Sequence, residues 1–335
     1  MARNISRYDD PTMAKLIGKC LESFDAQARD ELTKSMAVIA RSQPKAVAQQ
    51  LELKGSFQQL AVAKALRESG SDVLDMVAER LTNADARPNA SSYLVASGKS
   101  AIPSVLPQLD SKDKDVRLAA ADVLGKLRSR QAVDELTSKY RSTKGDEQYG
   151  YLAAIAGIGD PSSQGLLESA LEDSSLPVPQ RAQAELGLGR IASPATVELL
   201  WTYIDDEQRQ LRESAITALQ ISGDVALRHA PNDVANQLAV ASGVHSDLAN
   251  SIIAGALGTS NVGEAADAAH GRPELAEVLV SHLRSIEPDR QGDIADDLID
   301  ALASTPAGAA ALKTLDEPAL AGLVQRRLTL RGTQT

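Results

Sequence analysis

The chain has 335 residues, of which 43% are hydrophobic and 3% aromatic, and its formal net charge is −10. This acidic balance argues against a broad nucleic-acid-binding surface, because that affinity comes from lysine and arginine displacing counterions from phosphates. The single cysteine excludes an internal disulfide, charges run through the first twenty residues, and no apolar stretch reaches membrane-spanning length. We therefore expect a cytoplasmic protein without membrane insertion.

Residues 1–84 contain helical patterns that share no common repeat. The apolar periodicity predicts helices over 12–24, 28–42, 44–53, 57–69 and 72–82. We interpret these residues as divergent helical repeats, since an array of repeats needs atypical units at its ends. Cys20 is the one cysteine on these helices, and we interpret it as a small core residue and not as a nucleophile.

Residues 85–224 repeat a pattern about thirty residues long. The segment "DKDVRLAAADVLGKL" (113–127) places acidic residues before an arginine and an alanine-rich helical stripe after it. Positions equivalent to Arg117 follow one another at intervals of 30, 31, 33 and 31 residues, at Arg87, Arg117, Gln148, Arg181 and Arg212. Self-similarity at this period indicates a solenoid.

Each of these units divides into two helices. The first helices are predicted at 101–109, 132–140, 163–171 and 194–204, and the second helices carry the arginine position. In the second helix of one unit, Val116, Ala119 or Ala120, Val123 and Leu127 form the buried stripe. Acidic residues precede the second helices and suit helix capping, and no alternating strand pattern is sustained. The predicted fold class is all-α, an α-solenoid (superhelix) of antiparallel helix pairs.

Residues 225–335 again predict helix pairs, but without the arginine. The helical stretches are 233–243, 246–258, 273–286, 292–304 and 318–330. We interpret this region as divergent C-terminal repeats and a cap, continuous with the solenoid, with a loop or bend near 225–245.

The segment "AIPSVLPQLDSKDKDVRLAAADVLGKL" (101–127) resembles a HEAT repeat, specifically the short class found in phycobilisome-lyase-type proteins. The resemblance implies that the second helices line a concave face. It also implies that acidic residues and arginines form a ladder between neighbouring units, which Gln148 would interrupt. The ladder pairs expected on this basis are Asp110 or Asp115 with Arg117, Asp173 with Arg181, and Asp205 with Arg212.

Fragments that imitate catalytic motifs do not carry the chemistry. "GLGRIA" (187–192) has dinucleotide-binding spacing but follows a helical pattern instead of a strand, and "SGKS" (97–100) lacks the earlier glycine of a phosphate loop. No two histidines have the spacing of metal ligands on one helix face, and the carboxylate-rich stretch 293–300 is interpreted as a solvated face. We expect no catalytic residues, no cofactor and no metal.

The remaining hypothesis is protein binding by the second helices. Tyr149 is central to it, because tyrosine is enriched at binding hot spots and this unit lacks the arginine. The leading prediction is a non-enzymatic adaptor or scaffold that binds one or more proteins with the concave face. The alternatives are a lyase-type HEAT protein or subunit that handles a bilin chromophore, and a HEAT-like nucleic-acid-binding protein. The side chains predicted to face the partner are Leu118, Asp122, Lys126, Tyr149, Leu186, Arg190 and Glu213.

Overall fold

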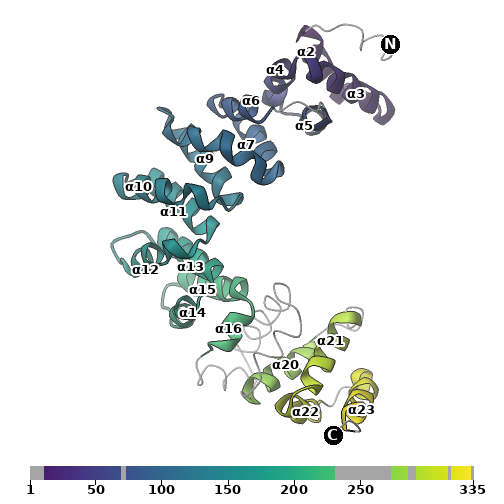
Figure 1. The fold of residues 1–335 in the computed structure, drawn as a ribbon, viewed down its shortest axis with the longest axis vertical. Coiled ribbons are helices and arrows are strands. Elements are labelled where there is room, and N and C mark those ends of the chain that lie inside the picture. The colour runs from purple at the N-terminus through teal and green to yellow at the C-terminus, as the bar shows by residue number, and fades with distance from the viewer. Residues whose placement is uncertain (1–10, 69–72, 231–272, 286–291, 316–317, 333–335) are drawn as a thin grey trace. The chain divides into compact units, whose positions relative to one another are not determined.

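The computed structural model describes residues 11–68, 73–230, 273–285, 292–315 and 318–332, and within these ranges it is helical with no strand (Figure 1). They divide into two compact units, Met1–Ile158 and Gly159–Thr335. The helices predicted at 233–243 and 246–258 lie outside the described residues, as does most of the segment 225–245. None of the described helices is both long enough and apolar enough to cross a membrane.

The helices of the first unit follow the predicted order closely. α3 packs on α5, α7 and α11 both pack on α9, and α10 packs on α11, so successive helix pairs lie on one another in chain order (Figure 1). This stacking is the arrangement of an α-solenoid. The helices are α2 (Pro11–Cys20), α3 (Ala26–Ser42), α4 (Pro44–Ala48), α5 (Ser56–Glu68), α6 (Leu74–Glu79), α7 (Arg87–Ala96), α8 (Ile102–Val105), α9 (Lys114–Lys126), α10 (Val133–Ser142) and α11 (Gly145–Ile158).

The helix predicted over 101–109 is shorter than expected. Only α8 is α-helical there, and 3₁₀ turns flank it at Gly98–Ala101 and Leu106–Asp110. Pro107, the second residue of the later turn, interrupts the α-helical pattern, because it has no N–H to donate to a carbonyl one turn earlier and its ring clashes with that carbonyl.

The second unit repeats the same pairing. α12 packs on α13, α13 on α15, and α14 on both α13 and α15, while α22 contacts α20 and α21. "GLGRI" forms the end of α13, and Ala192 follows it as the C-cap with φ of 51°, so the motif follows a helical pattern as predicted and not a strand. The helices are α12 (Gln164–Glu172), α13 (Val178–Ile191), α14 (Pro194–Trp201), α15 (Arg209–Ser222), α16 (Asp224–Arg228), α20 (Pro273–Ser285), α21 (Gly292–Ala303), α22 (Pro306–Leu312) and α23 (Pro318–Gly332).

Small residues let the second helices of neighbouring repeats pack closely. A Cβ atom added to Gly125 of α9 would lie 3.0 Å from the Cα of Ala154 in α11. A Cβ atom added to Gly189 of α13 would lie 2.7 Å from the Cα of Ala218 in α15. Distances this short leave no room for a side chain, so glycine at these two positions permits the contact.

The helix ends carry the predicted signals. Asp113 caps α9, where its side chain accepts a hydrogen bond from the backbone N–H of Asp115. Gly159 and Gly223 follow α11 and α15 with φ of 64° and 61°, a conformation that glycine adopts without strain. The buried stripe of α9 is also confirmed, with Val116, Ala120 and Val123 fully buried.

Candidate protein-binding surface

The residues predicted to face a partner lie on the second helices and none is buried. In the first unit, Asp122 and Lys126 of α9 are exposed and form an ion pair of 2.8 Å. Leu118 is half-buried against Gly150 of α11, where an added Cβ would collide with the Leu118 side chain. Tyr149 precedes this glycine and is 38% exposed. The second helices of the first unit therefore carry an exposed tyrosine, a half-buried leucine and an exposed charged pair.

In the second unit, the predicted residues lie on α13 and α15. Leu186 and Arg190 are half-buried, and the Arg190 Nη1 donates a hydrogen bond of 3.0 Å to the Leu186 carbonyl. Glu213 is exposed and pairs with Arg209 at 2.7 Å. We use the term second-helix face for these residues of each unit: Leu118, Asp122, Lys126 and Tyr149 in the first, and Leu186, Arg190 and Glu213 in the second.

The three clustered tyrosines have different environments. Tyr151 is 1% exposed and fills core volume, and Tyr140 of α10 is half-buried. Tyr149 is the most exposed tyrosine of the cluster. Trp201 is buried in the second unit, and its indole N–H donates to the Ala226 carbonyl of α16 at 3.1 Å.

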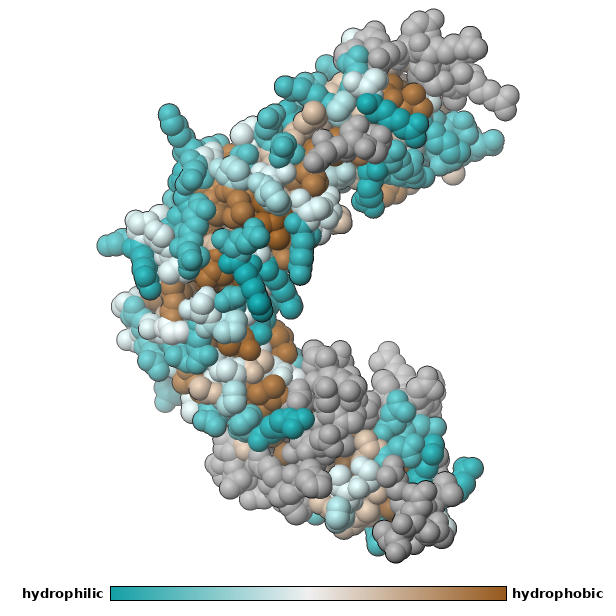
Figure 2. All heavy atoms as spheres, in the orientation of Figure 1, coloured by the Kyte–Doolittle hydropathy of each residue, from teal (hydrophilic) through white to brown (hydrophobic). Residues whose placement is uncertain are grey.

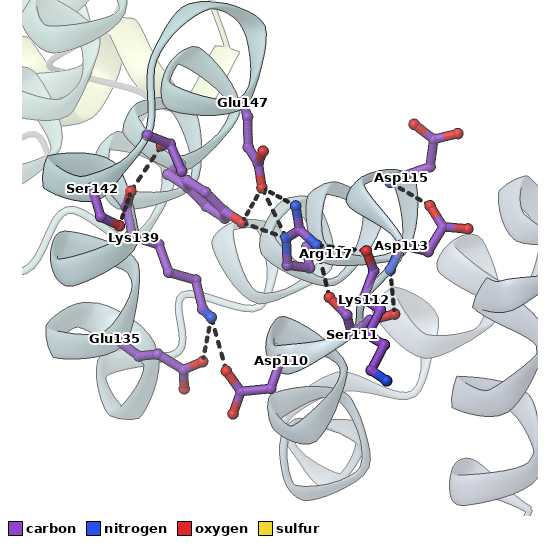
Figure 3. Close-up of polar contacts among 12 residues, drawn as sticks. Asp110, Ser111, Lys112, Asp113, Asp115, Arg117, Glu135, Lys139, Ser142 and Glu147 are labelled. Carbon is purple, nitrogen blue, oxygen red and sulfur yellow. Dashed lines mark hydrogen bonds and ion pairs between the residues drawn. The ribbon is translucent and has the colours of Figure 1, made fainter.

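Arg117 links two repeats, but through a different acid from the one expected. Its guanidinium contacts Glu147 of α11 at 2.6 Å and donates to the carbonyls of Ser111 and Lys112 at 2.8 and 3.1 Å. Figure 3 shows this guanidinium between the Glu147 carboxylate and the backbone of the preceding turn, with Asp115 directed away from it. The contact joins α9 to the next second helix.

At this contact, burial and hydrogen bonding have opposite effects on the pKa of Glu147. Partial burial alone disfavours the charged Glu147 carboxylate, but hydrogen bonds from Arg117 and Tyr151 outweigh it and lower the pKa of Glu147. The hydrogen bond to Glu147 raises the pKa of Arg117. Burial, followed by the hydrogen bond to Glu147, raises the pKa of Tyr151. The carboxylate is therefore ionised and paired at neutral pH.

The expected acid–arginine ladder is wrong in its partners. Asp115 pairs with Arg87 at 3.2 Å, and Asp110 pairs with Lys139 at 2.9 Å. Asp173 accepts hydrogen bonds from the side chain and backbone of Ser175. The structure gives no ion pair between Asp205 and Arg212 within the described residues. Asp110 and Asp115 therefore join neighbouring repeats through Lys139 and Arg87, whereas Asp173 forms a hydrogen-bonded turn with Ser175.

The repeated arginine has a different common role. Its side chain donates to a backbone carbonyl at the end of the preceding first helix or in the turn after it, where carbonyl groups lack partners within a helix. Gln148 occupies the arginine position and does the same, because its side-chain amide donates to the Tyr140 carbonyl at 3.3 Å. Gln148 is therefore a substitute and not an interruption. The other contacts are Arg87 to Leu81 (2.8 Å), Arg117 to Ser111 (2.8 Å), Arg181 to Leu171 (2.7 Å) and Arg212 to Asp206 (2.7 Å).

The remaining predictions concern Cys20, the histidines and the carboxylate-rich stretch 293–300. Cys20 is not a core residue: it is half-exposed and lines a groove beside α2. His229 lies 3.7 Å from Glu198, and the described part of the chain contains no group of three or more His, Cys, Asp or Glu that could hold a metal. In the stretch 293–300, Asp297 is exposed and Asp300 pairs with Arg327 at 3.1 Å.

Glu185 is the residue that the sequence reasoning missed. It is fully buried on α13, and its Oε2 accepts a short hydrogen bond from the hydroxyl of Ser214 on α15, whereas Oε1 has no partner. Burial raises the pKa of Glu185 to about 8. The carboxyl is therefore mostly neutral at pH 7. A signal was present, because the position four residues after the arginine position is apolar in three of the other four repeats, at Ala121, Leu152 and Ile216, and is a serine, Ser91, in the fourth.

One comparison with known protein families agrees with the repeat pattern. Residues 102–186 match a family model described as HEAT repeats. This segment consists of HEAT repeats. The match confirms the predicted resemblance there, and the phycobilisome-lyase subclass stays a prediction. No curated protein matches the chain in sequence.

Solved structures similar to this chain include an engineered protein, with 19% identity, a TM-score of 0.41 and coverage of 95% of this chain and 98% of that one. Kap121p bound to Nup53p has 13% identity and a TM-score of 0.39. The karyopherin Kap121p bound to the extreme C-terminus of the protein phosphatase Cdc14p has 12% identity and a TM-score of 0.37. Each of these two matches covers 95% of this chain and 43% of Kap121p. This chain therefore spans less than half of the length of Kap121p.

Proposed function

We propose that this chain is a non-enzymatic adaptor or scaffold that binds one or more proteins through the second-helix face. Stacked helix pairs offer a long surface with regularly spaced side chains, and repeat proteins commonly bind partners on such surfaces. The single cysteine supports placing this role in a reducing compartment, the cytoplasm.

The observation that carries the proposal is the exposure of Tyr149. The described residues include six exposed large hydrophobic side chains, of which five lie before residue 61 and the sixth is Tyr149. Exposing a tyrosine in the middle of a repeat array leaves apolar area in water with no structural gain, and tyrosine is a frequent hot-spot residue. The residue after it, Gly150, faces the Leu118 side chain of α9, so an apolar contact between the two second helices lies next to Tyr149 in the sequence.

The bilin-lyase and nucleic-acid alternatives have less support. The regular repeats carry neither cysteine nor histidine, and the net charge of −10 opposes phosphate binding. Absorbance after incubation with a bilin and a salt-dependent DNA or RNA shift assay address these two alternatives separately.

Tyr149→Ala and Arg190→Glu should each weaken partner capture at least tenfold while the melting temperature stays unchanged. Hot-spot truncations commonly have effects of this size on affinity, and neither side chain is buried. The measurement is affinity capture of the tagged chain from its own cells, with the co-purified proteins quantified.

The matched controls lie on the first helix α10. Tyr140→Ala and Arg141→Glu repeat the same chemical changes away from the second-helix face. Capture by the two second-helix variants that equals capture by these controls would show that this face does not bind the partner.

A further inference from the structure

An open groove lies between α2 and α3, far along the chain from Tyr149. It has a volume of about 650 Å³, and most of its exposed lining is apolar. Figure 2 shows hydrophobic residues gathered between these two helices. Leu16 and Phe24, which line it, are 55% and 44% exposed. Side chains of this kind are rarely left open together on a protein without a binding role.

α2 is apolar on two faces, and only one of them is covered. Ala14 is fully buried, as is Leu21 in the 3₁₀ turn after α2, and Gly18 faces the Leu53 side chain, so this face packs into the first unit. The other stripe, Met13, Leu16 and Cys20, lines the groove at a spacing of three and four residues. An amphipathic helix needs one apolar face to fold against its neighbours, so the second stripe is available for another molecule.

The shape of the groove fits a helix. Ala28 and Leu32 on α3 form the opposite wall, so the groove runs between two helices as the space for a third helix would. α2 has ten residues, which corresponds to about 15 Å and nearly three turns of a helix lying along it. Binding of this kind uses apolar anchors at i, i+3 or i+4 and i+7. A small-molecule site would instead have polar groups converging inside it.

The charges of the lining define the partner further. Asp25 and Glu31 are its ionisable carboxylates, both on the α3 side and both exposed, and the lining includes no lysine or arginine. Asp25 caps α3 through the backbone N–H of Ala28. Glu31 accepts from Lys34 at 3.3 Å, but Lys34 has a closer partner in Asp30 at 2.7 Å. The Glu31 carboxylate can therefore accept a second cation.

A second copy of the chain fits this groove less well. A symmetric dimer brings the same patch of both subunits together, so Asp25 and Glu31 would face their own copies. A basic partner gains from the same carboxylates, and the net charge of −10 would favour its approach.

We propose that the α2–α3 groove is a docking site for an amphipathic helix of a partner protein whose apolar stripe is flanked by lysine or arginine. This site is separate from the second-helix face and does not depend on the proposed role of Tyr149.

Cys20 provides a direct readout, because it lines the groove and is the chain's single cysteine. The probe is an 18-residue synthetic helix with leucines at i, i+3, i+4 and i+7 and lysines beside them. Two matched peptides carry glutamate in place of the lysines, or the same residues in scrambled order. The measurement is the rate of Cys20 alkylation in the full chain, followed by intact mass. The lysine peptide should slow alkylation at least tenfold, and the other two should leave the rate within twofold.

Variants test where the peptide binds. Leu16→Asp should abolish the protection, and Glu31→Lys should weaken it at least tenfold while improving protection by the glutamate peptide. Leu60→Asp is the matched control, because Leu60 is 68% exposed on α5 and does not line the groove. It should leave the protection unchanged. Circular dichroism of each variant should match the natural chain, since these side chains are exposed.

Several outcomes would overturn the proposal. These are no protection by the lysine peptide, equal protection by the glutamate peptide, or protection that survives Leu16→Asp. Alkylation of Cys20 that is already much slower than that of a free thiol before any peptide is added would also overturn it. If dilution then restores fast alkylation, the occupant is a second copy of the chain. If deletion of residues 1–10 restores it, the occupant is the chain's own N-terminal segment.

Discussion

At pH 8, the variant Glu185→Gln should be more stable than the natural chain by about 3 kcal/mol, and at pH 5 this advantage should have disappeared. Glu185 is fully buried, and its pKa is raised from 4.5 to about 8. A carboxyl with a raised folded-state pKa contributes its stability in full below pH 4.5. That contribution is lost as the pH rises through about 8, because the buried group must then ionise or the helices separate.

Hydrogen bonding explains why the neutral acid is tolerated. The Ser214 hydroxyl has one proton and two acceptors within reach, the Glu185 Oε2 and the Gln210 carbonyl at 2.9 Å. It donates to the Glu185 carboxylate when that group is ionised, and when Glu185 is protonated it can donate to Gln210 while the Glu185 O–H donates to the Ser214 oxygen. The glutamine amide can make the same donation without titrating. The contribution of the buried glutamine to the free energy of unfolding should therefore not depend on pH.

The measurement is chemical denaturation of both chains at pH 5 to 8, together with hydrogen exchange in α13 and α15. The matched control is Glu172→Gln, an exposed glutamate in the same unit. A stability difference between Glu185→Gln and the natural chain that stays constant from pH 5 to 8 would contradict the raised pKa.

Gly189→Ala should destabilise the second unit by about 2 to 3 kcal/mol. An added Cβ would collide with the Ala218 carbonyl oxygen and lie 2.7 Å from the Ala218 Cα, and both atoms belong to the backbone of α15. Backbone cannot rotate away as the end of a side chain can, so α13 and α15 would have to separate.

The control for helix propensity is Gly322→Ala in α23 of the same unit. Nothing lies within 4 Å of a Cβ there, so this variant should gain about 0.5 kcal/mol from the better helix propensity of alanine. Denaturation midpoints and hydrogen exchange of α15 measure both changes. Equal free energies of unfolding for Gly189→Ala and Gly322→Ala would show that α13 and α15 do not pack as closely as described.

The sequence predicted the helices well because their apolar spacing reflects local geometry. The buried stripe of α9 and the glycine after α11 follow from single-helix rules that need no knowledge of neighbours. The break around Pro107 could have been predicted too, because a proline inside a predicted helix removes a donor. The contacts between side chains of different repeats could not be predicted in this way.

The arginine contacts illustrate that limit. The spacing shows that Arg117 recurs, but its carboxylate partner, Glu147, lies one position before Gln148 in the next repeat, and only the packing of α9 on α11 brings the two together. Likewise, the repeat register marks Glu185 as unusual but cannot show that it is fully enclosed. The groove was not predicted, because a short helix with two apolar stripes has the same sequence pattern as a helix that is buried on all sides.

The central claim is that the second helices form the protein-binding surface, and site-specific photocrosslinking in the native cells tests it most directly. A benzophenone amino acid would replace Tyr149 of α11 or Glu213 of α15, and in the controls Asp134 of α10 or Glu198 of α14, all four exposed. The proposed function predicts crosslinks to the same partner from positions 149 and 213 and none from 134 and 198. Crosslinks from 134 and 198 alone would contradict it.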